Sequence, residues 1–224
     1  MSGLSSGERE LATLAAALRA LEEDIGAARQ AARRAGAGHG VDPPRPSRAE
    51  VGERGELVTL ADGARIVIRP IEPADSADLA TAFRRLSALS RFRVFGERVD
   101  RLAPDQVFEL THVDHESRET LVALDAATGE GVGLARYVRM PDDPARADVR
   151  CTVVDGWQHR GVGSALAERL AARARAAGIE RCTALILLGN EPARRLLAHV
   201  AEETSERRDG ATVDITAEAR EDAP

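Results

Sequence analysis

The segment DVRCTVVDGWQHRGVGSALAERL, residues 148–170, contains three features that decide the fold of the surrounding chain. It begins with a run in which Val149, Cys151 and Val153 alternate with other residues, the pattern of a β-strand with one apolar face. It continues into an amphipathic helix, predicted from Gly161 to Ala177. The loop between them aims backbone N–H groups and the positive end of the helix dipole at one point, where a phosphate would bind.

Two glycines, Gly161 and Gly163, stand at the start of this helix. Because glycine has no Cβ, the backbone could approach an anion closely there, and Arg160 would add a charge-assisted donor. The alternative is an ordinary strand-to-helix turn. Two common phosphate motifs are excluded, since the P-loop requires a lysine and no G-x-G-x-x-G follows a strand here.

Strands and helices alternate on both sides of this segment. Asp62-Gly63 between two apolar runs is a strong hairpin signal, and Gly178 is a good helix terminator. The order ββααβββαβαββ, without an internal repeat, predicts a mixed α/β domain. The expected elements are strands at 57–60, 65–71, 120–125, 132–138, 148–154 and 182–188, helices at 75–87, 104–113, 161–177 and 192–200, and a final hairpin around Asp209-Gly210.

The N-terminal region has its own pattern. Apolar residues between Leu11 and Ala28 recur at alternating steps of three and four, which predicts one amphipathic helix with a narrow apolar stripe. This stripe could pair with a second copy in a homodimer, which we favour, or pack on the core of its own chain. We expect an N-terminal helix at 1–38, a Gly/Pro-rich linker at 39–55, the main domain at 56–217 and a tail at 218–224.

Composition narrows the classes of function. The net charge of −6 disfavours nucleic acid as a partner. No run approaches the roughly 20 apolar residues of a membrane span, and no secretory signal is evident, so we expect no membrane association and a cytoplasmic location. Only Cys151 and Cys182 are present, without metal-ligand spacing, so we expect no metal and two reduced, buried thiols. All 31 basic residues are arginine.

The loop also carries a family resemblance. Its residues Gln158-His159-Arg160-Gly161-Val162-Gly163 match the Q/R-x-x-G-x-G/A signature of the GCN5-related N-acetyltransferases (GNAT family), which the chain resembles over about residues 56–217. Within that family the stretches RLSALSRFRVFG, HVDHESRETLVAL and GLARYVR are similar to actinobacterial protein lysine acetyltransferases.

This resemblance implies the fold and the reaction. The GNAT fold is an α/β fold whose mostly antiparallel sheet has splayed central strands and is flanked by helices. The implied cosubstrate is acetyl-CoA. The implied acceptor is a primary amine, either a protein lysine, for example on an acyl-CoA synthetase, or a small-molecule amine. The implied cofactor-binding residues are Val153 and Val154 for the pantetheine arm, Gln158, His159, Arg160, Gly161, Val162, Gly163 and Ser164 for the pyrophosphate, and Asn190 near the lower arm.

Asp148 is the candidate general base, because the acetyltransferases of this resemblance carry a glutamate there and a lysine ammonium must lose a proton before it attacks. The alternative is a solvated charge in a turn. The chain departs from many family members at Leu197, where they carry a tyrosine that protonates the leaving thiolate. Cys151 could be an acyl acceptor, but its place on an apolar strand face favours core packing.

Two other classes of function stay open. A catalytically weak domain that senses acetyl-CoA would keep the loop and lack efficient acid and base groups, as Leu197 and the shorter side chain of Asp148 suggest. A scaffold that acts through its N-terminal helix would not need an intact loop. The leading hypothesis is therefore an acetyl-CoA-dependent N-acetyltransferase.

Overall fold

The computed structural model describes residues 55–95, 98–210 and 212–219. The N-terminal helix expected at 1–38, and the homodimer that would form through it, lie outside these residues. None of the helices in the described ranges is long and apolar enough to cross a membrane.

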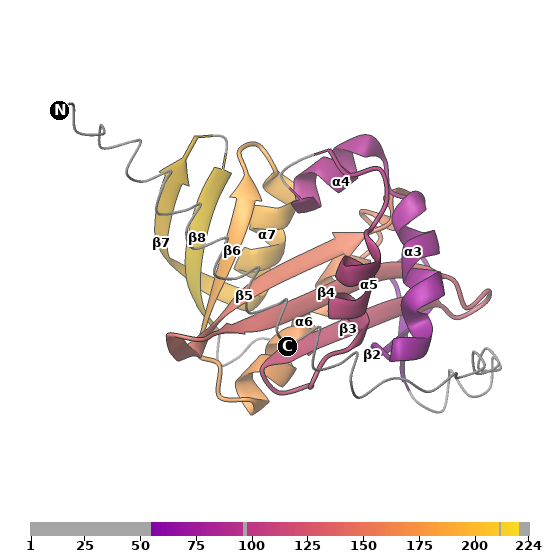
Figure 1. Cartoon of the computed structure of the whole chain (residues 1–224), viewed down its shortest axis with the longest axis horizontal. Helices are drawn as coiled ribbons and strands as arrows, with labels where there is room; N and C mark the ends of the chain where they lie inside the picture. Colours follow the sequence, from indigo (N-terminus) through magenta and orange to yellow (C-terminus); the bar gives the residue numbers. More distant parts are fainter. Residues whose placement is uncertain (1–54, 96–97, 211, 220–224) are drawn as a thin grey trace. The chain divides into compact units, whose positions relative to one another are not determined.

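One eight-stranded sheet forms the centre of the described domain (Figure 1). Its strand order is β1-β2-β3-β4-β5-β6-β8-β7, and every neighbouring pair is antiparallel except β5 and β6, which are parallel. The strands are β1 (Glu56–Thr59), β2 (Arg65–Pro70), β3 (Arg118–Asp125), β4 (Gly131–Met140), β5 (Asp143–Val153), β6 (Arg181–Leu187), β7 (Ala201–Asp209) and β8 (Thr212–Ala219).

Helices cover both faces of this sheet. In Figure 1, α3, α4 and α5 lie on one face, and α6 and α7 lie on the other. The helices are α3 (Ser76–Arg84), α4 (Ala88–Phe95), α5 (Pro104–Thr111), α6 (Val162–Ala176) and α7 (Glu191–Val200), with short 3-10 turns at Pro73–Asp75 and Asp155–Trp157. The expected mixed, mostly antiparallel α/β architecture is confirmed.

The main apolar core lies between α6 and the centre of the sheet. Leu166 of α6 is fully buried against strand residues such as Leu121 and Ala135. A second cluster joins α6 to α7 through Ala167 and Leu197. Helix α6 therefore packs on both the sheet and α7. The loop that precedes it leads into a rigid element.

One helix was not expected from the sequence. The predicted helix at 75–87 ends earlier, at Arg84, and α4 follows as a separate helix. Ser87 explains the break, because its hydroxyl accepts a hydrogen bond from the Ser90 N–H at 3.1 Å, as an N-cap side chain does. The missed helix matters because α4 forms one wall of the cleft described below.

We predict that Leu166→Ala will lower the free energy of unfolding by about 2–5 kcal/mol, because it removes a fully buried side chain and leaves a cavity. Chemical denaturation measures this change. Leu57→Ala is the matched control, since Leu57 is 55% exposed and its truncation should change stability by no more than about 0.5 kcal/mol. Equal losses in both variants would contradict the assigned core.

Candidate functional site

A cleft opens where β5 and β6 separate. The two strands pair only over three positions, Arg146–Asp148 with Arg181–Thr183. Beyond them, β5 stays paired with β4 alone. Val154 donates its N–H to the Val132 carbonyl at 2.9 Å, which makes positions 132 and 154 a hydrogen-bonded pair. Because such pairs alternate along an antiparallel ladder, the amides of Cys151 and Val153, which lie beyond the last β5–β6 pair, point away from β4 into the opening.

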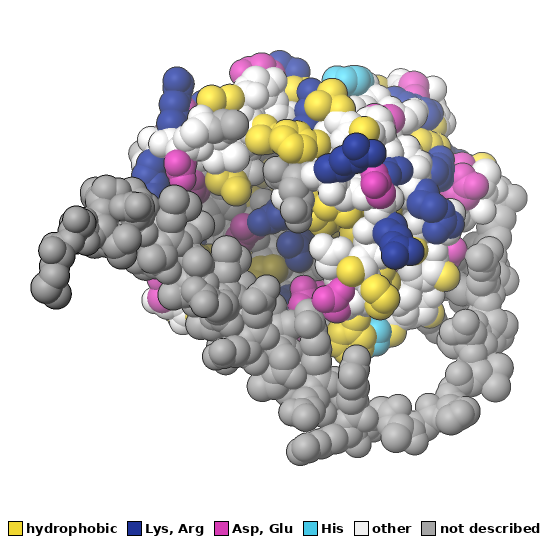
Figure 2. Space-filling model, turned by 45° about the horizontal axis from the view of Figure 1, so that its top comes forward, with side chains coloured by type: hydrophobic (Ala, Val, Ile, Leu, Met, Phe, Trp, Pro, Cys, Tyr) yellow, Lys and Arg dark blue, Asp and Glu magenta, His cyan; other side chains and the backbone are white. Residues whose placement is uncertain are grey.

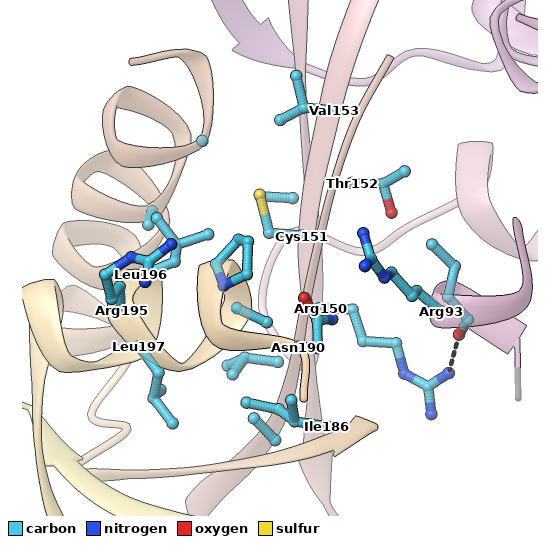
Figure 3. A pocket seen from close by; sticks show the side chains of 18 of the residues that line it. Arg93, Arg150, Cys151, Thr152, Val153, Ile186, Asn190, Arg195, Leu196 and Leu197 are labelled. Atoms are coloured by element: carbon cyan, nitrogen blue, oxygen red, sulfur yellow. Dashed lines mark hydrogen bonds between the residues drawn. The ribbon is translucent and has the colours of Figure 1, made fainter. Parts of the chain in front are cut away.

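The cleft encloses about 630 Å³. Its walls are α4, the second half of β5, the start of α6, the second half of β6, and α7. In Figure 3, Leu196 and Leu197 come from α7 on one side, and Arg93 of α4 with Arg150 of β5 come from the other. The α7 side is thus largely apolar but also carries Arg195, which Figure 3 shows beside Leu196, and the opposite side is cationic.

The loop before α6 turns sharply at Gly161. This residue has a φ of 95°, a left-handed conformation that glycine adopts without strain, and His159 shares it at 61°. The first hydrogen bond of α6 runs from the Ala165 N–H to the Gly161 carbonyl, and no side chain caps the helix. The amides of Val162, Gly163 and Ser164 therefore precede the intrahelical bonds at the edge of the cleft.

Gly163 tests whether this edge fits an anionic cofactor. A Cβ at this position would point between Leu196 and Val153 and lie 3.6 Å or more from any neighbour, so the protein itself leaves room for a methyl group. The same space belongs to the cleft. A glycine that packing does not require, next to helix-start amides, fits a ligand that comes close to the backbone.

Most of the predicted loop residues line the cleft. Gln158, His159, Gly161, Gly163 and Ser164 do so, as does Asn190 at the start of α7. Val162 is fully buried, so it can contribute only its amide. The Gln158 side chain donates to the Val153 carbonyl at 3.1 Å and so ties the loop to the end of β5.

Two of the predicted cofactor contacts already have partners within the protein. The guanidinium of Arg160 stacks over the Trp157 ring at 4.1 Å and pairs with Asp62 at 2.5 Å, beside a smaller cavity, so its charge is already engaged. The backbone of Val154 is used within the protein, because its N–H donates to Val132 and its carbonyl accepts from the Trp157 N–H at 2.8 Å. Val153 alone remains a candidate strand contact.

Asp155 joins the loop to α4, a link that the sequence did not reveal. Its carboxylate accepts hydrogen bonds from the Ser87 N–H at 2.8 Å and the Ser90 hydroxyl at 2.9 Å. Burial alone would raise the pKa of Asp155. The hydrogen bonds lower it by more than burial raises it, so the pKa lies below its ordinary value. The start of α4 is thus fastened to the loop that precedes α6.

Asp148 lies at the closed end of the cleft. It forms the last pair between β5 and β6, with Thr183. Its side chain is 31% exposed and accepts from the Arg150 Nε at 3.2 Å. Asp148 is not among the residues that line the cleft itself, although Arg150 is. The Asp148 carboxylate therefore lies beside the cleft, and Arg150, which lines the cleft, holds it there.

The remaining candidates behave as apolar residues. Leu197 is 8% exposed within the core cluster and has no group that could donate a proton. Cys151 is half-buried against the main core, and burial raises the pKa of its thiol to about 12, so it is protonated at neutral pH. In the described ranges no three His, Cys, Asp or Glu side chains gather as they would around a metal ion.

Comparison with known proteins identifies relatives of this chain. The family model of the acetyltransferase (GNAT) domain matches residues 65–200. The acetyltransferase Pat of Mycolicibacterium smegmatis is 28% identical over 142 residues, which are 62% of this chain and 42% of Pat. The chain therefore spans less than half the length of this curated relative.

Solved structures that resemble this chain include members of the same family. The crystal structure of the GNAT domain of S. lividans PAT has a TM-score of 0.68 and 29% identity, and the match covers 75% of this chain and 98% of that one. YncA of Salmonella typhimurium, solved with its cofactor acetyl-CoA, has a TM-score of 0.54 at 18% identity, covering 70% of this chain and 94% of its own. The latter likeness shows the fold alone.

We predict that Asp155→Ala will lower the free energy of unfolding by about 1 kcal/mol at pH 7, because two hydrogen bonds to a carboxylate are lost. The folded-state pKa is lowered, so the stabilisation is present above the unfolded pKa of about 3.9 and lost as the pH falls through the folded value. Denaturation of both proteins between pH 2 and 7 measures this. The exposed Asp142, changed to alanine, is the control, and a difference that grows below pH 3 would contradict the assignment.

Proposed function

The chain belongs to the GNAT acetyltransferase family, and from that premise we propose that it transfers the acetyl group of acetyl-CoA to a protein lysine. GNAT acetyltransferases use acetyl-CoA as the donor. The observation that carries the proposal is the β5–β6 cleft, into which the Val153 amide and the first amides of α6 open. The cytoplasmic location expected from the sequence is part of this proposal.

Acetyl-CoA, when bound, supplies an activated thioester carbonyl. The amides of Val162, Gly163 and Ser164 would bind its phosphates, aided by the positive end of the α6 dipole. The Val153 N–H, which points away from β4, would donate to a carbonyl oxygen that becomes negative during transfer. Asn190 lines the other side of the opening, where it precedes α7 after strand β6.

Asp148 is the proposed base. A lysine ammonium has a solution pKa of about 10.4, so a nearby carboxylate must accept its proton at neutral pH. The Arg150 Nε holds the Asp148 carboxylate at the closed end of the cleft. Because this carboxylate does not line the cleft, we propose that one water carries the proton from the amine to Asp148.

A catalytically weak acetyl-CoA sensor is the second candidate. It is favoured by Leu197, which is buried and cannot protonate a leaving thiolate. A small-molecule amine is the alternative acceptor. An acetylation assay against an acyl-CoA synthetase and a panel of small amines separates these readings. The chain contains no lysine, so every acetyl-lysine that mass spectrometry detects comes from the acceptor.

The proposed homodimer rests on the stripe in residues 1–38 alone. Light scattering on the full chain and on a chain lacking residues 1–47 tests it. A full-length monomer at micromolar concentration would exclude the dimer and leave the enzymatic proposal unchanged.

We predict that Gly163→Ala will keep the stability of the free protein and weaken acetyl-CoA binding, because the added methyl group fits the protein but fills part of the cleft. Differential scanning fluorimetry with acetyl-CoA measures both properties, since a ligand present at a hundred times its Kd adds about 2.7 kcal/mol to the folded state. Gly156→Ala is the matched control, because a Cβ there meets nothing within 4 Å. An unchanged shift in Gly163→Ala would place the cofactor elsewhere.

We predict that Asp148→Asn will lower kcat/KM by about a hundredfold or more, while acetyl-CoA binding stays within about twofold of the wild type, because the amide cannot accept the proton. Steady-state kinetics against lysine peptides measures the loss. Cys151→Ala serves as a comparison and should keep most of the activity, since the thiol is protonated and packs in the core. Full activity of Asp148→Asn at pH 7 would remove Asp148 as the base.

A further inference from the structure

The cleft has a cationic wall that binding of acetyl-CoA does not require. Arg136 of β4 and Arg150 of β5 are direct cross-strand partners, so their side chains share one face of the sheet. This is the face opposite α6, because the neighbouring pair Ala135 and Cys151 packs towards α6. Arg150 lines the cleft, and Arg93 reaches the same space from α4 (Figure 3). Arg136 does not line the cleft itself but lies beside Arg150 on the neighbouring strand.

The charges on this wall are incompletely neutralised. Arg150 donates to the Asp148 carboxylate and to the Val94 carbonyl at 3.4 Å. Among the described residues, the guanidinium groups of Arg93 and Arg136 form no hydrogen bond or ion pair within the distance of a direct contact. Burial and the adjacent Arg150 lower the pKa of Arg136, although Asp148 and Glu109 partly offset these effects. Figure 2 shows arginine and acidic side chains set back in a hollow of the displayed face.

Like charges on facing strand positions destabilise a sheet. An arrangement of this kind is compensated when an anion binds, and the planar guanidinium matches a carboxylate through paired N–H donors. A lysine alone would be repelled from this wall, whereas a lysine next to a carboxylate would bring the missing negative charge with it. The charge pattern therefore selects among amines.

The outer edge of the wall is suited to a polypeptide. On α4, Leu89 and Phe92 are exposed by 57% and 43%, and Arg93 follows directly after them. An apolar surface beside a cationic cleft is typical of a site that binds a peptide segment. A nucleic acid fits less well, because the chain as a whole carries a net charge of −6.

We propose that the acceptor lysine is flanked by an Asp or Glu within one or two residues, and that Arg93 and Arg150 bind this carboxylate while the charge of the adjacent Arg136 adds to the attraction. The inference rests on the proposed function and specifies its acceptor. Arg93 is the recognition residue in the cleft, Arg136 contributes its charge from the neighbouring strand, and Arg150 also orients Asp148.

Binding of an unreactive peptide tests the inference without catalysis. Two fluorescent peptides carry glutamine in place of the target lysine and differ only in having Glu or Gln beside it. Fluorescence anisotropy should show that the acidic peptide binds the full chain about tenfold more tightly, and that the difference shrinks as salt is added. Equal binding of both peptides would overturn the inference.

Variants place the recognition in the wall. Arg93→Gln should remove most of the preference, and circular dichroism will show whether it remains folded. Arg207→Gln is the control, since Arg207 lies on β7 and is 84% exposed, and the preference should persist. A preference that is unchanged in Arg93→Gln and also in Arg136→Gln would overturn the inference.

The lysine versions of the same peptides separate this inference from the proposed function. In the acetylation assay, kcat/KM should favour the acidic peptide by a similar factor. If neither peptide is acetylated while the acidic peptide still binds selectively, the transfer to protein lysine is wrong and anion recognition stands. If both peptides are acetylated equally and bound equally, the recognition of a flanking carboxylate is wrong and the transfer to protein lysine stands.

Discussion

The site depends on the point where hydrogen bonding between β5 and β6 stops. Buried backbone amides almost always have a partner, yet after the Asp148–Thr183 pair the outward amides of β5 face an opening rather than a strand. The opening persists because each of its walls is held in place. On one side, α6 and α7 share an apolar cluster, and on the other, α4 is tied to the Asp155 carboxylate.

The two walls of the opening present different chemistry. At the start of α6, the donors at the edge of the opening are neutral backbone amides at the positive end of the helix dipole, while Arg160 is engaged by Trp157 and Asp62. On the α4 side, guanidinium groups dominate. Asp155 belongs to the loop of the first wall and caps the helix of the second, so the two walls are fastened to each other at one carboxylate.

Local patterns were sufficient to predict the strand-loop-helix segment and most of the elements, because strand alternation, glycine turns and helix periodicity are short-range signals. They failed where the answer depends on register or on distant residues. The engagement of the Val154 amide and the pairing of Arg136 with Arg150 follow from strand alignment. The N-cap at Ser87 that separates α4 is a local signal that the sequence analysis missed. The bonds from Ser87 and Ser90 to Asp155 join residues more than sixty positions apart, so the role of α4 as a wall could not be seen.

The sheet ends at β7, which in the described part of the chain pairs only with β8. An edge strand invites another molecule to add to it, and proteins prevent this with charges and bulges. The sequence of β7, AEETSERRD, carries acidic and basic side chains along its length, and its register shifts between Glu203 and Ser205. An incoming strand would have to desolvate these charges and match an irregular ladder. The edge is thereby protected against aggregation, a property that selection for catalysis alone would not require.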